Sequence, residues 1–150
     1  MESARPAVVD DLETISALWA TAAAELREER GGRLVLTREA AALNPTKRFG
    51  ETTSLVAAGL YDEVIVGFAV AHIEKLSDNS TLGVIEALYV EPGARAVGVG
   101  EALMSIIVDW AQRQGCSGVD ALVLPGMRDS KNFFEAHGLT ARAIVVHRDL

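Results

Sequence analysis

The sequence predicts a single α+β domain over residues 1–150, built around a mixed sheet. The predicted element order is strand, two helices, three strands, helix, strand, helix, strand, and it favours a mixed sheet over a doubly wound parallel one. Hydrophobic residues make up 49% of the chain and charged residues 23%, which is typical of globular proteins. A chain of 150 residues is long enough to bury a core without disulfides.

The first half of the chain begins with a predicted strand at residues 5–9. The stretch 10–29 follows with apolar residues at three- and four-residue steps, which predicts an amphipathic helix. Asp10 and Glu13 resemble a capping box at its start, and the glycine pair at 31–32 ends it. Thr37 is expected to cap a second, shorter helix, "REAAALN", which Pro45 limits.

The second half alternates strands and helices. "SLVAAGL" and "VIVGFAVAHIEKL" flank the turn "YDE" and predict a hairpin, and "GVIEALYV" predicts a further strand. An apolar stripe from Val99 to Trp110 predicts a helix that Gly115 closes. The remaining elements are expected to be a strand "VDALVL", a short helix "SKNFFEAH" and a final strand "ARAIVVHRDL".

The composition argues against several classes of protein. A net charge of −7 disfavours a nucleic-acid binder, which needs clustered Lys and Arg. No apolar run approaches the ~18 residues of a membrane span, and the first residues lack a signal-peptide pattern. The one cysteine, Cys116, fits a reducing cytoplasm, and no Cys, His and carboxylate spacing indicates a metal site.

The stretch "LYVEPGARAVGVGEALM", residues 88–104, places Arg95, Gly98 and Gly100 at a helix entrance. The first N–H groups of a helix lack intrahelical partners and attract anions, and glycines let a phosphate approach them closely. A helix entry packed tightly against the sheet explains the same residues. The spacing is neither G-x-G-x-x-G nor a Walker loop, so a Rossmann or P-loop site is not indicated.

This stretch resembles the acyl-CoA-binding motif of the GNAT superfamily of N-acetyltransferases, Gln/Arg-x-x-Gly-x-Gly/Ala, with Arg95, Gly98 and Gly100 in the signature positions. The resemblance extends along nearly the whole chain. "ARPAVVDDLETISALW" is similar to the opening strand and helix of the family, and "YDEVIVGFAVAHIE" to its second hairpin. "NFFEAHGL" is similar to the late "FYEK-x-GF" segment.

The resemblance implies a largely antiparallel GNAT-type sheet flanked by about four helices, with acetyl-CoA or another short acyl-CoA as co-substrate. The strand around residues 84–90 is expected to splay from the strand at 119–124, with the thioester between them. Backbone amides from Val97 to Glu101 would cradle the pyrophosphate, with the Glu101 side chain pointing outward. The implied CoA-binding residues are Leu88, Val90, Arg95, Ala96, Val97, Gly98, Val99, Gly100, Glu101, Asn132 and Phe134.

Acyl transfer to an amine requires removal of a proton, because an alkylammonium has a pKa near ~10. Glu86 is the one ionisable side chain in "GVIEALYV" and is the first candidate for the base, acting directly or through water; a position on the solvent face of the strand is the alternative. Asp120 is the second candidate. The histidines at 72, 137 and 147 are expected to have core or surface roles.

The sequence departs from the family pattern at Phe134, where relatives usually carry a Tyr that protonates the departing thiolate. Tyr89 and Ser130 are candidate substitutes, although strand alternation turns Tyr89 away from Glu86. Met127 stands at the commoner position of a family Asn, and Asn132 is a candidate to replace it.

The predicted function is N-acyltransfer from acetyl-CoA to the primary amine of a small molecule or exposed peptide, in a ternary complex. The alternative is a catalytically weak acyl-CoA-binding sensor or subunit, which Phe134 favours and Glu86 disfavours. A third possible function is acetylation of a protein or of a charged tRNA. The net negative charge of the chain disfavours tRNA as the acceptor. We expect a cytoplasmic protein that binds neither nucleic acid nor membrane, and a homodimer formed through the final strand.

Overall fold

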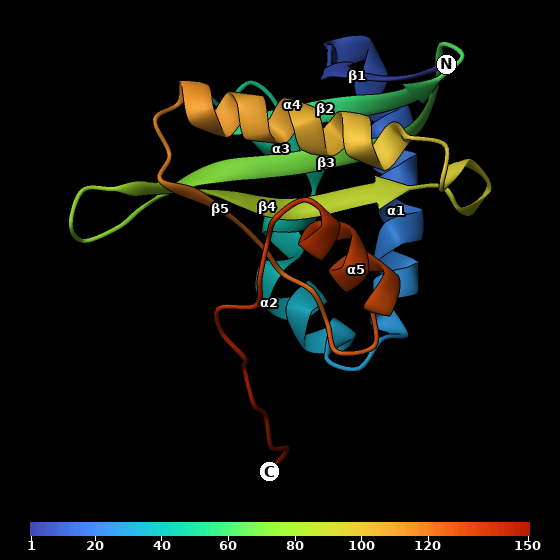
Figure 1. The fold of residues 1–150 in the computed structure, drawn as a ribbon. Helices are drawn as coiled ribbons and strands as arrows, with labels where there is room; N and C mark the ends of the chain where they lie inside the picture. The colour runs from blue at the N-terminus through green and yellow to red at the C-terminus, as the bar shows by residue number, and fades with distance from the viewer.

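The structure is a computed structural model that describes the backbone of residues 1–150 and the side chains of residues 1–38 and 44–150. A five-stranded sheet with the order β1-β2-β3-β4-β5 is antiparallel except for the parallel pair β4–β5 (Figure 1). This confirms the predicted fold class. The elements are β1 (Glu2–Pro6), the 3-10 turn η1 (Val9–Asp11), α1 (Leu12–Arg27), α2 (Gly32–Leu43), α3 (Pro45–Arg48), β2 (Ser54–Tyr61), β3 (Val64–Lys75), β4 (Thr81–Val90), η2 (Pro92–Ala94), α4 (Val99–Arg113), β5 (Gly118–Ala121) and α5 (Arg128–Ala136).

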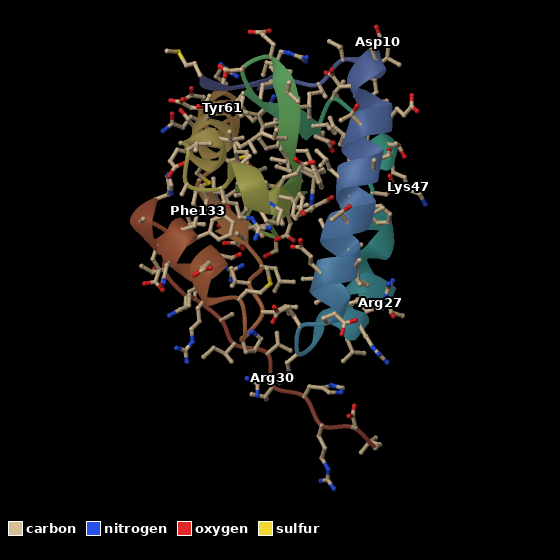
Figure 2. All side chains as sticks on the ribbon, turned by 90° about the vertical axis from the view of Figure 1, so that its right-hand side faces the viewer. Asp10, Arg27, Arg30, Lys47, Tyr61 and Phe133 are labelled. Carbon is tan, nitrogen blue, oxygen red and sulfur yellow. The ribbon has the colours of Figure 1, made fainter. Side chains whose placement is uncertain are left out.

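The sheet is covered on both faces, with α4 on one side and α1 on the other (Figures 1 and 2). Strand β3 shows how its apolar run serves both layers. Phe68 and Val70 pack in the cluster around α1, whereas Ala69 and Ala71 pack in the cluster around α4. All four side chains are almost fully buried. This part of the strand is therefore apolar on both faces and does not alternate between apolar and polar residues.

The hairpin between β2 and β3 is confirmed. Its two central residues, Asp62 and Glu63, have φ values of 47° and 68°, and Tyr61 pairs with Val64 across the turn. Two consecutive residues with positive φ are typical of the tight turn whose twist matches that of the flanking strands. The helix predicted from Val99 is also confirmed as α4, with Leu103 and Ile107 fully buried.

The beginning of the chain differs from the prediction in its boundaries. The first strand spans Glu2–Pro6 instead of residues 5–9, because the chain turns into η1 at Val9. The capping box predicted at Asp10 and Glu13 is not formed. The carboxylate of Asp11 accepts the N–H of Val8 at 2.8 Å instead, and its Oδ2 and Oδ1 accept the guanidinium of Arg5 at 2.6 and 3.1 Å.

The second helix begins earlier than predicted. Gly31 adopts φ +83° and lets the chain reverse after α1, so that α2 starts at Gly32. Thr37 is therefore inside the helix and caps nothing. Its hydroxyl donates to the carbonyl of Arg33 at 2.8 Å, a bond that a Thr makes within a helix. The rest of the predicted helix 38–44 lies mostly among residues 39–43, whose side chains are outside the described set.

The final strand predicted at 141–150 is not formed. From Leu139 onward the chain has no regular structure, and its last residues extend away from the sheet (Figure 1). Ile144, Val145 and Val146 have strand-forming side chains, yet each is more than four-fifths exposed, because no strand lies beside them in the described part of the chain. β5 also ends at Ala121, short of the predicted 119–124.

None of the helices in the described part of the chain combines the length and apolar character that a membrane span needs.

Candidate functional site

Strands β4 and β5 part in the middle of β4. Their parallel pairing runs from Leu82↔Gly118 to Ile85↔Ala121 and then stops, while β4 continues to Val90 paired only with β3. The remaining half of β4 thus has an edge that no other described strand covers. This is the splay that the sequence predicts, and it ends at the entrance of α4 (Figure 1).

The splay begins at an irregularity in β4. Ile85 pairs with Ala71 and Ala87 pairs with Val70, which leaves Glu86 without a partner across the strands. Such an extra residue is a β-bulge, and it shifts the inward and outward alternation of the residues that follow.

The entrance of α4 carries a run of unused backbone donors. In the described chain, no N–H group from Ala96 to Glu101 donates a hydrogen bond, and the first one used is that of Ala102, which reaches the carbonyl of Gly98 at 3.0 Å. Ala96 and Gly98 have φ values of 67° and 94°, and successive N–H groups of a turn with positive φ form a concave anion site. The turn therefore presents a set of free donors at the position where the resemblance implies a pyrophosphate site, and the binding role of these donors stays a prediction.

The two glycines of this turn also have reasons within the chain. A Cβ on Gly98 would lie 2.9 Å from Cγ of Glu2, and a Cβ on Gly100 would lie 3.1 Å from Cε1 of Phe133. Figure 2 shows Phe133 on α5 directed toward the α4 side of the molecule. Close packing of the helix entry, the alternative explanation left open by the sequence, therefore accounts for glycine at both positions. It does not involve the backbone N–H groups of the turn, which remain free.

Arg95 lies against the end of β4. Its Nε donates to the carbonyl of Val90 at 2.8 Å, and its Nη2 donates to Glu25 of α1 at 3.3 Å. The guanidinium also lies 5.5 Å from the ring centroid of Tyr89, whose hydroxyl donates to the same Glu25 at 3.1 Å. Burial and the Glu25 carboxylate raise the pKa of Tyr89. Arg95 thus joins α1 to the mouth of the splay.

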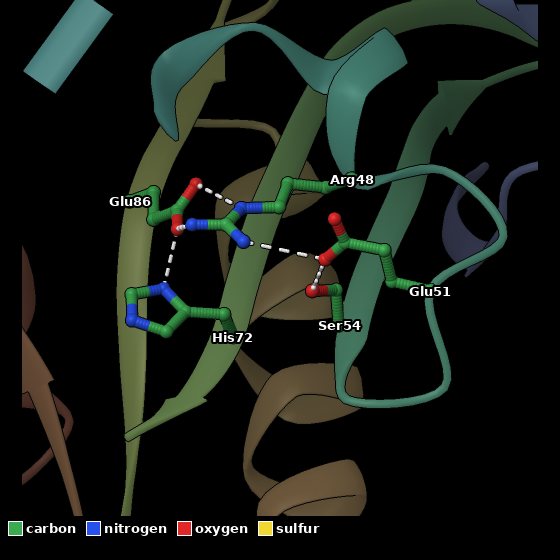
Figure 3. A network of polar contacts seen from close by, with 5 residues as sticks. All are labelled: Arg48, Glu51, Ser54, His72 and Glu86. Carbon is green, nitrogen blue, oxygen red and sulfur yellow. Dashed lines mark hydrogen bonds and ion pairs between the residues drawn. The ribbon is translucent and has the colours of Figure 1, made fainter. Parts of the chain in front are cut away.

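Glu86 is in an ion-pair cluster that the sequence does not indicate (Figure 3). Its carboxylate is 4% exposed; Oε1 lies 2.7 Å from Nη2 of Arg48, and Oε2 accepts Nε of the same guanidinium at 3.3 Å. Nδ1 of His72, on β3, contacts Oε1 as well. Glu86 is therefore neither a solvent-facing nor an unpaired carboxylate.

Arg48 is also tied to the loop that follows α3. Its Nη1 donates to Glu51 at 3.2 Å, and the hydroxyl of Ser54 donates to the same carboxylate oxygen at 2.7 Å. The Ser54 hydrogen bond lowers the pKa of Glu51. Burial alone would lower the pKa of Arg48, but its bonds to Glu86 and Glu51 raise the pKa overall.

Tyr89 does not lie on the opposite face from Glu86, contrary to the expectation from strand alternation. The side chains of Ala87 and Tyr89 pack in the α1 cluster, and Glu86 pairs with Arg48 of α3, which contacts α1. The bulge places Glu86 and Ala87 successively toward this face. Tyr89 is nevertheless bonded to Glu25 rather than to Glu86.

The other candidates occupy separate places. Asp120 is bonded to Nε of Arg142 at 2.9 and 3.0 Å, which lowers the pKa of Asp120. Phe134 is partly buried and packs with Phe133 against the α4 cluster, with their ring centroids 5.4 Å apart. Asn132 and Glu101 are exposed.

Leu88 and Val90 are the main-chain candidates on β4, and the side chains of both pack in the α4 cluster. The carbonyl of Val90 already accepts a hydrogen bond from Arg95.

Sequence reasoning missed Arg48 and assigned His72 to the core or surface. The register Ser54↔His72↔Val84 places His72 beside the point where β4 and β5 part. Arg48 comes from a helix of four residues, and no spacing in the sequence relates it to Glu86.

Comparisons with known proteins identify the family and the fold. Residues 19–139 match the model of the acetyltransferase (GNAT) family. No curated protein matches the sequence.

Solved structures of similar fold cover nearly the whole chain. The chain is similar to AAC(6')-Iy in complex with a bisubstrate analogue, CoA-S-monomethyl-acetylneamine, with 19% identity, a TM-score of 0.75 and coverage of 100% of this chain and 99% of the other. It is also similar to a ribosomal-protein-alanine N-acetyltransferase from Brucella melitensis biovar Abortus 2308, with 14% identity, a TM-score of 0.74 and 99% coverage of both chains. An acetyltransferase from Trypanosoma brucei has 21% identity, a TM-score of 0.69 and full coverage of both chains. At these identities the likeness concerns the fold. Because the family model matches most of its length, this chain belongs to the GNAT acetyltransferase family.

Proposed function

We propose that the protein transfers an acetyl group from acetyl-CoA to the primary amine of a small molecule or exposed peptide. The observation that carries this proposal is the run of free N–H groups from Ala96 to Glu101 at the open end of the β4–β5 splay. Six consecutive donors at a helix start match the needs of a diphosphate, and family membership makes CoA the natural ligand.

Within this proposal the amides of Val97 to Glu101 hold the pyrophosphate, and the free edge of β4 around Leu88 meets the pantetheine arm. Arg95 adds positive charge beside these amides, and its hydrogen bonds to Glu25 of α1 and to the carbonyl of Val90 connect α1 to β4. We assign Asn132 and Phe134 of α5 to the same binding site, as the family resemblance implies. The thioester supplies an electrophilic carbonyl, and a backbone N–H of β4 is suited to polarise its oxygen.

The reaction is a direct attack. The amine nitrogen forms a bond to the carbonyl carbon, the C–S bond breaks, and the thiolate leaves with the electron pair. The amine proton must be taken up by a group near the splay. Glu86 is the first candidate for that group, and its ion pair with Arg48 holds the carboxylate in place.

The first test is release of free CoA thiol from acetyl-CoA in the presence of pooled polyamines, amino acids, aminoglycosides and short peptides. We expect amine-dependent release that increases between about pH 6 and pH 9 as the amine loses its proton. Binding of acetyl-CoA should be measured in parallel by calorimetry. If no amine and no peptide or protein supports release, the transferase proposal fails.

The second candidate is an acyl-CoA sensor with little turnover. Phe134 favours it, because this side chain packs against the α4 cluster and offers no hydroxyl to the departing thiolate. Tight acetyl-CoA binding without release from any acceptor would select this candidate.

A homodimer in the cytoplasm is part of the proposal. The exposed residues 144–146 and the outer edge of β5, which pairs only with β4 in the described part of the chain, offer complementary unpaired backbone. Sedimentation velocity should show a dimer, and the double variant Ile144→Lys, Val146→Lys should be monomeric. A wild-type monomer at every concentration would remove this part.

A further inference from the structure

We propose that His72 accepts the amine proton and that Glu86 and Arg48 position it. This inference rests on the proposed acetyl transfer. The proposed base is therefore the imidazole of His72 in place of the Glu86 carboxylate. Glu86 contacts the imidazole, and Arg48 in turn forms an ion pair with Glu86 (Figure 3).

The ion-pair contact with Glu86 distinguishes the two ring nitrogens. Nδ1 of His72 is buried and contacts Oε1 of Glu86, although neither atom has a hydrogen bond of regular geometry. We assign the ring hydrogen to Nδ1, because a charged carboxylate only accepts. In a neutral imidazole, Nε2 is then unprotonated and is an acceptor. In the described chain Nε2 has no hydrogen-bond partner, so its lone pair is available.

Burial separates His72 from Glu86 as candidates for the base. The Glu86 side chain is 4% exposed, and Arg48 and His72 together occupy its oxygens. The His72 side chain is 24% exposed and can be reached by an amine. A carboxylate paired with a guanidinium is a weak base, whereas an imidazole changes its charge near neutral pH.

The position of His72 suits this role. It pairs with Val84, one residue before the last rung of the β4–β5 ladder at Ile85↔Ala121. The imidazole therefore stands beside the start of the splay, on the face where the bulge places Glu86. In the proposed step the amine nitrogen bonds to the acetyl carbon, its proton moves to Nε2, and the C–S electrons leave with sulfur. The imidazolium, stabilised by Glu86, later returns the proton to water or thiolate.

The charged groups near the ring come from several elements. Glu86 faces it from β4, Arg48 from α3 and Glu51 from the following loop, where Glu51 interacts electrostatically with His72. Glu74 is two residues further along β3 and is exposed. The pH dependence of the variants below is expected to reflect these groups together with the amine.

The test compares His72→Gln with the wild type in steady-state kinetics. We expect kcat to fall about a hundredfold near neutral pH, as for loss of a general base, with the KM for acetyl-CoA unchanged. The loss should shrink toward pH ~9, where solvent deprotonates more of the amine. The matched control is His147→Gln, which removes another imidazole that contacts a carboxylate, Asp149, on the exposed tail; its kinetics should equal those of the wild type.

A second readout does not depend on turnover. The 15N chemical shifts of the His72 ring should report a hydrogen on Nδ1 in the wild type, and Glu86→Gln should change that signature and lower kcat less than His72→Gln does. A His72→Gln enzyme that turns over at the wild-type rate, or a wild-type ring with its hydrogen on Nε2, would overturn the inference. If the wild type itself releases no CoA, the proposed function fails instead.

Discussion

Nη2 of Arg48 lies 2.7 Å from Oε1 of Glu86, although the two residues are 38 positions apart in the chain. This ion pair connects a short helix on one face of the sheet to the bulge in β4 from which the splay opens. The carboxylate is nearly buried, so its charge depends on this partner and on His72 for compensation.

Arg48→Met should lower the free energy of unfolding by about 2–3 kcal/mol, because it leaves the buried Glu86 carboxylate with His72 alone. Chemical denaturation measures the change. The double variant Arg48→Met, Glu86→Gln should recover part of the loss, since it removes the uncompensated charge. Equal stabilities of the single and double variants would show that Glu86 does not need the guanidinium.

Gly98→Asp should reduce acetyl-CoA affinity at least about tenfold more than Gly98→Asn does, because only Asp places a negative charge at the proposed phosphate cradle. Both substitutions are strained to a similar degree at the positive φ of 94° found at Gly98, and both would displace the flexible Glu2 side chain, so the comparison isolates the charge. Calorimetric titration with acetyl-CoA gives the comparison. Similar affinities of the two variants would show that the backbone around Gly98 does not bind the pyrophosphate.

Phe134→Tyr should raise kcat, because a hydroxyl at this position could protonate the departing thiolate. Thiol release with a good amine acceptor measures the effect. An unchanged rate in Phe134→Tyr would mean that thiolate departure is not the slow step.

The Arg5 hydrogen bond holds the pKa of Asp11 below its ordinary value, against the opposing effect of burial. The folded-state pKa is thus lower than the unfolded one of ~3.9, so this stabilisation is fully present above that pH and is lost as the pH falls through the folded pKa. Asp11→Asn should lower the free energy of unfolding by about 1–2 kcal/mol at neutral pH. The difference in the free energy of unfolding between the variant and the wild type should become smaller below pH ~4. Asp10→Asn, at an exposed neighbour, should change stability by less than about 0.5 kcal/mol. A gap that does not vary with pH would contradict the assignment.

The sequence by itself determined the features that depend on local patterns. The two-residue turn at Asp62 and Glu63, the apolar stripe of α4 and the entrance with Arg95, Gly98 and Gly100 are each contained in a short stretch of chain. Their conformations follow from side-chain periodicity and backbone preferences that act between near neighbours. This local information was enough to predict most strands and helices, and the motifs that it contains carried the resemblance to the GNAT family, which in turn implied the splay.

The tertiary structure alone decided which side chains meet. Arg48, His72 and Glu86 come from α3, β3 and β4, and they meet because strand register and a one-residue bulge direct them to one point; a slip of one residue would turn a side chain to the other face. The same reason explains the predicted final strand that is not formed. Ile144 to Val146 have the side chains of a strand, but a strand exists only where another backbone lies beside it to pair.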